Sequence, residues 1–390
     1  DSYKKVGERH PVDGTPYWTT QSVRAGGKAG IPTLMSGLAQ HHGMKPGRFI
    51  VETHCHGQRH AVNAQATGDD DYGSLADKMK TAVPADEAGD DEDVIVYDNS
   101  DRVLYDMDAY GVDMAVLLSG FGMTNEINKG IIDENPEKFI AAAAPVQTKK
   151  KALRGEEEWT WEAAAEELDE WLSKDGFRMT GEGIRGDPTR TEPIEWSERK
   201  KDMRHVFDVA AKHDVPVRWH TGYASGYGGN HLFQLYPDWS DPTLASELKA
   251  EYPEVPIIFD HGGMQAGWDE QYVDAACKVA GTFDDVYLEI GLYWAELMKK
   301  PINDPNIGYD QLLWGNDWGA SMVQHHQPNE YPPTFWEQIA DRGLPAHQPD
   351  YWGAGLRQLL KYAMETDLPQ DKLNLILGGN AVRLFDIEGV

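Results

Sequence analysis

Eight short apolar stretches that alternate with helical stretches place the strongest constraint on the fold of this chain. They are near-continuous apolar runs, which indicates buried strands. They cover residues 49–56, 112–118, 139–146, 182–186, 215–220, 256–261, 286–290 and 312–317. Helices are expected between them, at 101–110, 124–135, 156–172, 197–213, 244–252 and 268–280. Buried strands separated by helical crossovers predict a parallel sheet.

The number of strands favours one parallel architecture over another. Eight strands predict an α/β fold of the (β/α)8 TIM barrel type, whereas an open doubly wound sheet usually carries a glycine-rich phosphate turn. The glycine-rich segment 226–229 lacks the strand-turn-helix context of such a turn. We therefore expect a barrel over residues 49–390, with residues 1–48 as an extension packed on it. Long loop insertions are expected at 57–98 and about 319–356.

The first predicted strand runs directly into His54 and His56, which are separated by Cys55. Residues i and i+2 of a strand point to the same face, so the two imidazoles should project together while Cys55 points away. Two imidazoles at the end of one strand form half of a transition-metal site. Cys55 is expected to be a small buried apolar residue.

Several other predicted strands also end in residues that suit a metal or ligand site. Chemistry in TIM barrels gathers at the C-terminal ends of the strands. These ends carry Arg185, His220, His261, Glu289 and Asp317. Three neutral imidazoles and one carboxylate, from His54, His56, His220 and Asp317, suit zinc or a similar divalent ion.

Five motifs make the chain resemble the amidohydrolase-2 branch of the amidohydrolase superfamily. They are ETHCH at 52–56, PVRWHTG at 216–222, PIIFDHGGM at 256–264, LLWGNDW at 312–318 and LILGGNAVRLF at 375–385. They occur in the family's order, and the resemblance runs from about residue 49 to the C-terminus. It implies that His54, His56, His220 and Asp317 bind the metal and that His261 is a catalytic histidine beside it.

Two positions depart from the family pattern. Glu52 stands where the family more often has Asp, and its longer side chain is expected to change the hydrogen bonding to the ligands. Arg185 stands at the predicted end of the fourth strand, where binuclear relatives carry a carbamylated lysine. This difference favours a single divalent ion, with zinc as the expected metal and manganese as the alternative. The extension and the insertions are poorly covered by the resemblance and are expected to shape the substrate pocket.

The resemblance and the strand-end positions suggest a role for each candidate residue. A divalent ion lowers the pKa of bound water to ~7, and Asp317 would hold the ion and accept a proton from that water. His261 would polarise a substrate carbonyl or stabilise an oxyanion. Arg185 would clamp a substrate carboxylate, and Glu289 and Arg59 are further candidates for substrate binding. An arginine or glutamate at a strand end can instead pair with a neighbouring charge.

Three functions remain in competition. The first is a metal-dependent hydrolase that acts on a lactone, an amide or a related carbonyl compound. The second is a non-oxidative decarboxylase of an aromatic or unsaturated carboxylic acid. Thr221 favours hydrolysis, because decarboxylase relatives more often have a proline after the histidine that corresponds to His220. The third is a catalytically inactive binding protein, whose expected signature is a lost ligand.

Composition narrows the partners to a small-molecule substrate. The chain of 390 residues has a formal net charge of −29, which argues against nucleic-acid and anionic membrane partners. No apolar run approaches the ~20 residues of a membrane helix, and two cysteines imply no disulfide framework. Nothing in the sequence resembles a signal peptide, so we expect a cytoplasmic protein. Its oligomeric state is left open, with a homodimer as one option.

Overall fold

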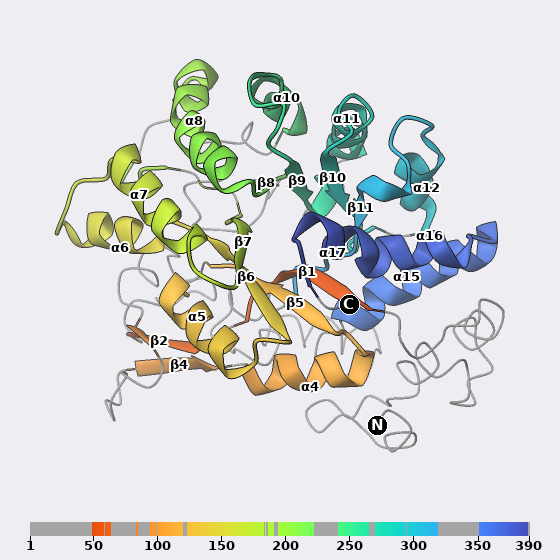
Figure 1. Ribbon diagram of the computed structural model, residues 1–390, viewed down its shortest axis with the longest axis horizontal. Coiled ribbons are helices and arrows are strands. Elements are labelled where there is room, and N and C mark those ends of the chain that lie inside the picture. The colour runs from red at the N-terminus through yellow and green to blue at the C-terminus, as the bar shows by residue number, and fades with distance from the viewer. Residues whose placement is uncertain are drawn as a thin grey trace, which may run out of the picture.

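A computed structural model of the chain describes residues 49–57, 59–63, 83–84, 94–98, 100–119, 123–182, 184, 186–190, 194–221, 241–264, 270–293, 295–318 and 351–388. The expected N-terminal extension, residues 1–48, lies outside the described residues, so the boundary at residue 49 stays a prediction. The described part is built around parallel strands that are surrounded by helices (Figure 1). No helix in this part is both long enough and apolar enough to cross a membrane.

The parallel strands of the described part form two half-sheets of four strands each. The first has the order β1 (Val51–Cys55), β5 (Met114–Leu117), β6 (Phe139–Ala143) and β7 (Phe177–Thr180). The second has the order β11 (Leu312–Leu313), β10 (Val286–Glu289), β9 (Ile257–Asp260) and β8 (Val217–His220). Within each half-sheet, neighbouring strands are consecutive in the chain apart from the strands of the insertion, as right-handed β-α-β units require.

Hydrogen bonds at both edges join the half-sheets into a closed barrel. On one side, the backbone N–H of Thr53 donates to the carbonyl of Trp314 at 3.1 Å, and the N–H of His56 donates to the carbonyl of Trp318 at 2.7 Å. On the other side, the N–H of Thr180 donates to the carbonyl of Pro216 at 3.1 Å. The predicted TIM barrel is therefore confirmed, and the C-terminal ends of all its strands meet at one end.

Helices follow most of the strands and lie around the barrel (Figure 1). They are α4 (Ser100–Tyr110), α5 (Asn125–Glu134), α6 (Val146–Arg154), α7 (Trp161–Leu172), α8 (Trp196–His213), α10 (Pro242–Glu251), α11 (Glu270–Ala280), α12 (Ala295–Asn303), α15 (Tyr351–Thr366), α16 (Gln370–Asn374) and α17 (Asn380–Leu384). Thr124 and Thr160 set the starts of α5 and α7, because their hydroxyls accept the first free backbone N–H groups. The expected helices are confirmed, although α7 begins five residues later than expected.

The fourth barrel strand lies earlier in the chain than predicted. It covers Phe177–Thr180, whereas the sequence pattern predicted residues 182–186. The charged Arg178 and the polar Thr180 interrupt the apolar pattern of this strand, although Phe177 and Met179 are buried in the core. The chain then passes close to β6, because a Cβ at Gly181 would lie only 2.7 Å from the Cβ of Ala144. The first charged residue after the strand is therefore Glu182 and not Arg185.

Two further differences concern segments next to the barrel. The strand predicted at 139–146 ends at Ala143, and α6 begins at Val146. The described part of the insertion at 57–98 contains a small antiparallel sheet with the order β3 (Val83–Pro84), β2 (Arg59–Asn63) and β4 (Val94–Asp98). The acidic composition of the insertion hides these short strands in the sequence pattern.

Alternation along β8, β9 and β10 separates the interior of the barrel from the core beneath the helices. Outward residues such as Val217, Ile257 and Val286 pack in the large cluster shared with the helices. The inward side is apolar towards the N-terminal ends of the strands, where Ile258, Tyr287 and Leu313 pack with Ala381 and Phe385 near α17. Towards the C-terminal ends, the inward positions become polar, with Arg218, Asp260, Glu289 and His220. Because side chains alternate along each strand, the polar residues form layers inside the barrel, next to a layer of apolar side chains at its N-terminal end.

Candidate metal centre

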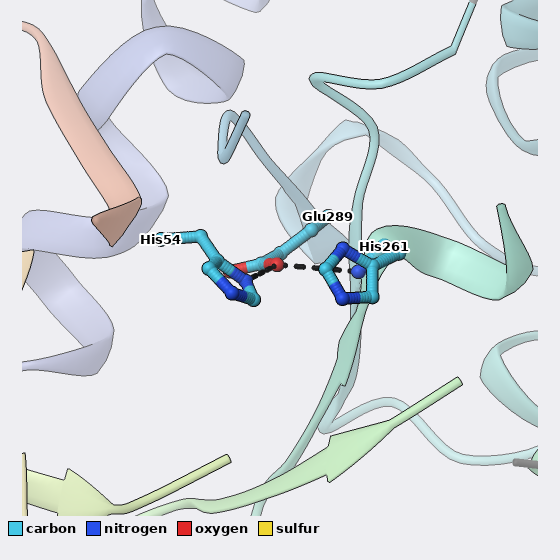
Figure 2. Close-up of side chains that lie close together, drawn as sticks. All are labelled: His54, His261 and Glu289. Carbon is cyan, nitrogen blue, oxygen red and sulfur yellow. Dashed lines mark hydrogen bonds and ion pairs between the residues drawn. The ribbon is translucent and has the colours of Figure 1, made fainter. Parts of the chain in front are cut away.

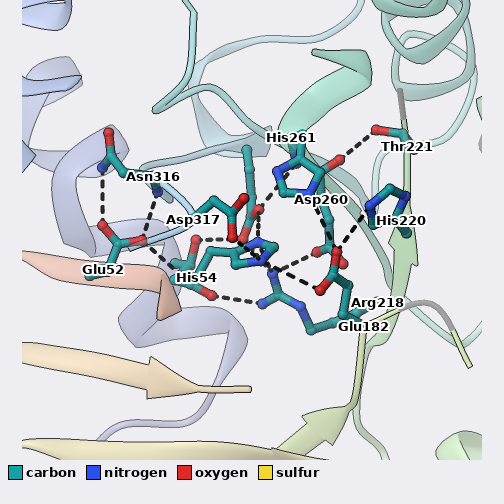
Figure 3. A network of polar contacts seen from close by, with 12 residues as sticks. Glu52, His54, Glu182, Arg218, His220, Thr221, Asp260, His261, Asn316 and Asp317 are labelled. Carbon is teal, nitrogen blue, oxygen red and sulfur yellow. Dashed lines mark hydrogen bonds and ion pairs between the residues drawn. The ribbon is translucent and has the colours of Figure 1, made fainter. Parts of the chain in front are cut away.

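Four histidines and two carboxylates converge at the C-terminal end of the barrel. Figure 3 shows three of these histidines together with the carboxylates of Glu182 and Asp317. His54 lies in β1 and His56 follows it, His220 ends β8, and His261 follows β9. The carboxylates belong to Glu182, two residues after β7, and to Asp317, which follows β11. His54 and His56 point to the same carboxylates, whereas Cys55 is buried in the outer core, as the period of the strand predicted.

The two histidines of the first strand share Asp317. The Oδ1 atom of Asp317 lies 3.1 Å from Nε2 of His56 and 3.4 Å from Nε2 of His54. The Oε2 atom of Glu182 lies 3.7 Å from each of the same two nitrogens. Four potential ligand atoms therefore surround one position at the mouth of the barrel.

Glu182 also connects this group to the other two histidines. Its Oε1 atom lies 3.3 Å from Nε2 of His220 and 3.3 Å from Nε2 of His261. The ligand atoms of Glu182, His220 and His261 all lie within 4.8 Å of one another, as do those of His54, His56 and Glu182. The carboxylate of Glu182 thus lies between the histidines of strands β1, β8 and β9.

The spacing and the bonding of these atoms fit a divalent metal ion. Ligand atoms around a tetrahedral zinc ion, with bonds of 2.0–2.1 Å, are about 3.3 Å apart. The distances around Asp317 and Glu182 range from 3.1 to 3.7 Å. Among the described residues, Nε2 of His54 and Oδ1 of Asp317 are buried and take part in no hydrogen bond. Buried polar atoms without a hydrogen bond are costly unless a cation satisfies them.

The charges of the cluster also favour a bound cation. Burial alone would raise the pKa of Glu182, but His220 and His54 hold it well below its ordinary value. Burial alone would lower the pKa of His54, but Glu289, Asp317 and Glu182 raise it well above its ordinary value. The cluster therefore binds positive charge strongly, and a metal ion can take the place of protons on the imidazoles.

Glu289 lies below the cluster and bonds to its far side. Figure 2 shows the Oε2 atom of Glu289 between the ring of His54, whose Nδ1 is 2.9 Å away, and the backbone N of His261, which is 3.3 Å away. These three residues also bring potential ligand atoms within 4.8 Å of one another. Because Oε2 of Glu289 already accepts these N–H groups, we interpret this arrangement as a hydrogen-bonded support for His54 and not as a metal site.

Glu52 supports the candidate metal ligands through the backbone. Its Oε1 accepts the N–H of His54 at 2.9 Å and the N–H of Asn316 at 2.7 Å, and its Oε2 accepts from Nδ2 of Asn316 at 3.0 Å. Burial raises the pKa of Glu52 to about 8. The longer side chain at this position therefore bonds to the backbone beside both His54 and Asp317, and ties β1 to the end of β11.

Two residues of the cluster have unusual backbone conformations. His261 has φ 63° and Asp317 has φ 54°. Both angles lie in the left-handed region, which residues other than glycine rarely adopt. The turn after His261 is held by Thr221, whose hydroxyl accepts the N–H of Gly263 at 2.7 Å and donates to the carbonyl of Asp260. Backbone strain of this kind gathers at functional sites, where it directs side chains into the site.

The structure describes two of the three predicted substrate-binding residues. Arg185 lies outside the described residues, so its role stays a prediction. Arg59 forms an ion pair with Glu134 of α5 at 2.7 Å, and no contact within the described part joins it to the cluster. Glu289 is completely buried beneath His54, so it cannot contact a substrate in this arrangement, and its position fits the pairing alternative.

Glu182 is the residue of the cluster that the sequence analysis missed. The reason is the misplaced fourth strand, which put Arg185 at the strand end. A signal was available in the sequence: Gly181 and Glu182 follow the short run 177–180, whose two buried apolar residues alternate with Arg178 and Thr180. A strand placed on that alternation ends two residues before Glu182.

Comparison with protein families agrees with the fold and the site. A family model described as Amidohydrolase, of the amidohydrolase-2 type, matches residues 51–387. The chain therefore belongs to the amidohydrolase-2 family, as its five motifs predicted, and the protein is an enzyme. The family includes metal-dependent hydrolases and decarboxylases. A comparison with curated protein sequences found no match.

Several solved structures resemble this chain at low identity. A probable 2-pyrone-4,6-dicarboxylic acid hydrolase from Acinetobacter baumannii is 14% identical with a TM-score of 0.47, and the match covers 87% of this chain and 99% of that one. A 5-carboxyvanillate decarboxylase from Novosphingobium aromaticivorans, solved with manganese, is 12% identical with a TM-score of 0.49, and the match covers 87% and 97%. An amidohydrolase 2 from Bifidobacterium longum subsp. infantis is 14% identical with a TM-score of 0.43, over 87% and 99%.

Proposed function

We propose that this enzyme is a metal-dependent hydrolase that uses water to cleave a carbonyl compound, such as a lactone or an amide. The observation that carries the proposal is the accessibility of the two carboxylates beside a buried histidine cluster. The four imidazoles are at most 5% exposed, whereas Glu182 and Asp317 are 17% and 18% exposed. A solvent-accessible carboxylate next to a cation site can accept a proton from an attacking water molecule.

The proposed ligands of the divalent ion are His54, His56 and Asp317, with His220 as the fourth predicted ligand. Glu182 lies between these residues and offers a further oxygen. Zinc is the proposed ion and manganese the alternative, because a mixed set of imidazoles and carboxylates suits both metals. When bound, such an ion supplies a Lewis acid and makes water a stronger acid.

Three side chains act on water and substrate in this proposal. Asp317 accepts the proton of the attacking water. His261, whose Nε2 faces Glu182 at 3.3 Å, polarises the substrate carbonyl or donates to the developing oxyanion, a contribution typically worth about 3 kcal/mol. Arg185 binds a substrate carboxylate, because its planar guanidinium matches two carboxylate oxygens.

Decarboxylation of an aromatic or unsaturated carboxylic acid is the alternative reaction. The residue that favours hydrolysis is Thr221, whose hydroxyl binds the N–H of Gly263 in the turn that carries His261. A proline at this position has no hydroxyl for that bond. Inactive binding is a weaker alternative, since none of the four predicted ligands is lost.

One experiment separates these functions. Enzyme loaded with zinc or manganese is incubated with lactones, amides and aromatic acids in ¹⁸O-labelled water, and the products and released CO2 are measured by mass spectrometry. A product that carries ¹⁸O, without CO2, supports hydrolysis. Release of CO2 without ¹⁸O in the product would replace hydrolysis by decarboxylation. Binding without any turnover would favour a binding protein.

A further inference from the structure

A buried arginine lies directly beneath the candidate metal centre. Arg218 is in β8, two residues before His220, so both side chains point into the barrel. Arg218 is 1% exposed, and its Nη1 donates to the carbonyl of Thr53 at 2.8 Å. Its Nη2 lies 2.7 Å from Oε1 of Glu289 and 2.6 Å from Oδ1 of Asp260. Burying a guanidinium is costly even when it is paired. A hydrophobic side chain of similar size at position 218 would cost less free energy to bury.

Glu289 connects Arg218 to the proposed metal ligand His54. Its Oε1 atom accepts from Arg218 and from the hydroxyl of Thr53 at 2.8 Å, whereas its Oε2 atom lies 2.9 Å from Nδ1 of His54. The Glu289 carboxylate faces the guanidinium of Arg218 at 2.7 Å, and an ion pair of this kind keeps the carboxylate ionised. An ionised carboxylate only accepts hydrogen bonds, so Nδ1 of His54 carries the proton.

Arg218 also lies close to His54 itself. Its contact with His54 differs in kind from its contact with Glu289. Its Nη2 is 3.1 Å from Nδ1 of His54, but a guanidinium can only donate. A hydrogen bond to a carboxylate is stronger than one to a neutral imidazole, so we assign Nη2 as the donor to Oε1 of Glu289, with Asp260 as an ion-pair partner. Nδ1 of His54 then donates to Glu289, which leaves the lone pair of Nε2 directed towards Asp317 and Glu182.

We propose that Arg218 is a positioning residue for the metal centre and that it acts through Glu289. It holds the Glu289 carboxylate where that group keeps Nε2 of His54 free to bind the ion. The inference rests on the proposed function, because it requires a metal ion at His54. A carboxylate that accepts from the far nitrogen of a metal-binding histidine fixes the orientation of the ring, and its loss typically weakens metal binding about 10- to 100-fold.

A double-mutant cycle on metal affinity tests this inference. The dissociation constants of zinc and manganese are measured by chelator competition for the full chain and for Arg218→Gln, Glu289→Gln and the double variant. We expect each single variant to bind about 10- to 100-fold more weakly. If Arg218 acts through Glu289, the double variant should bind no more weakly than Glu289→Gln alone. Arg218→Lys, which keeps the charge, should recover part of the affinity.

Lys249 provides a matched control for the loss of a buried cation. It is 1% exposed in α10, and its Nζ donates to the carbonyl of Val255 at 2.8 Å and pairs with Asp285 at 2.5 Å, outside the metal centre. Lys249→Gln should lower the melting temperature and leave the metal affinity within about twofold of that of the wild type. If it weakens metal binding as much as Arg218→Gln does, general destabilisation explains the effect and the inference is wrong.

The other outcomes are equally decisive. Unchanged metal affinity of Arg218→Gln, or a double variant whose loss is the product of the two single losses, would overturn the inference. If Arg218→Gln does not fold, the comparison uses Arg218→Lys. A partial loss of affinity in Arg218→Lys that disappears when Glu289 is already Gln supports the inference, and full affinity of Arg218→Lys would overturn it. A wild-type chain that binds neither zinc nor manganese would overturn the proposed function itself, before any variant is compared.

Discussion

The Nε2 atom of His56 lies 3.1 Å from Oδ1 of Asp317, although these residues follow the first and the last strands of the barrel. The contact exists because β1 and β11 are joined at the edge where the barrel closes, with the N–H of Trp318 donating to the carbonyl of His54 at 3.0 Å. Closure of the barrel therefore builds the candidate metal centre, and each residue in it can be tested separately.

Replacement of Asp317 by Asn should abolish turnover while the barrel stays folded. Asn tolerates the left-handed backbone of this position, φ 54°, so the change removes charge without added strain. We expect kcat/KM to fall at least about 100-fold, with an unchanged circular dichroism spectrum. Asp386→Asn is the matched control, because Asp386 has φ 49° and is exposed after α17. Near-wild-type activity of Asp317→Asn would show that its assigned role is wrong.

Replacement of Glu182 by Gln should weaken metal binding. The change keeps the size of the side chain but removes the negative charge that faces His54, His56, His220 and His261. We expect the dissociation constant of zinc to rise at least about 10-fold. Elemental mass spectrometry of the wild type and the variant measures the ions per chain. Equal metal content at limiting zinc would exclude Glu182 from the ligands.

Removal of the ion should lower the thermal stability. A ligand present at 100 times its dissociation constant contributes ~2.7 kcal/mol, which corresponds to roughly 3 °C for a chain of 390 residues. We expect treatment with a chelator to lower the melting temperature by this amount, and added zinc or manganese to restore it. Magnesium serves as the control, because it prefers six oxygen ligands. Restoration by magnesium alone would contradict a centre rich in imidazole.

Replacement of Gly181 by Ala should displace Glu182. The added Cβ would lie 2.7 Å from the Cβ of Ala144 and 3.1 Å from the carbonyl oxygen of Ala143, so β7 must shift away from β6. We expect a loss of about 1–3 kcal/mol in the free energy of unfolding, together with weaker zinc binding. Gly130→Ala is the control, because a Cβ there meets no atom within 4 Å and lies in α5. A variant at Gly181 with unchanged zinc affinity would show that this close contact does not position Glu182.

Asp169 should make a small contribution to stability that depends on pH. Hydrogen bonds from Lys212 at 2.6 Å and His213 at 2.6 Å lower the pKa of Asp169 below its ordinary value. A lowered carboxyl pKa stabilises the fold above the unfolded pKa of ~3.9, and this stabilisation is lost as the pH falls through the folded pKa. Because Asp169 is only partly buried and Lys212 is exposed, solvent screens their interaction, and we expect less than ~1 kcal/mol.

Melting curves of the wild type and Asp169→Asn from pH 7 to pH 2 measure this contribution. The wild type should melt slightly higher near pH 6, and the difference should disappear at the acidic end. A difference that grows on acidification would contradict the direction of the pKa shift.

Much of this architecture could be predicted because it depends on local periodicity. Alternating apolar strands and helices indicated the barrel, and the period of two along β1 placed His54 and His56 on one face. The same reasoning failed at β7, since Arg178 and Thr180 interrupt the apolar run of a strand only four residues long. An error of a few residues there left Glu182 out of the predicted site.

The sequence by itself determined most of the barrel strands and most of the residues at their ends, because side-chain direction follows from the regular geometry of each strand. Only the tertiary structure decided which of those ends meet. Glu182, His220 and His261 come together through the closed barrel, and Arg218 reaches Glu289 and His54 across its interior. Contacts of this kind depend on the register and tilt of strands that are distant in the chain, and no local pattern carries that information.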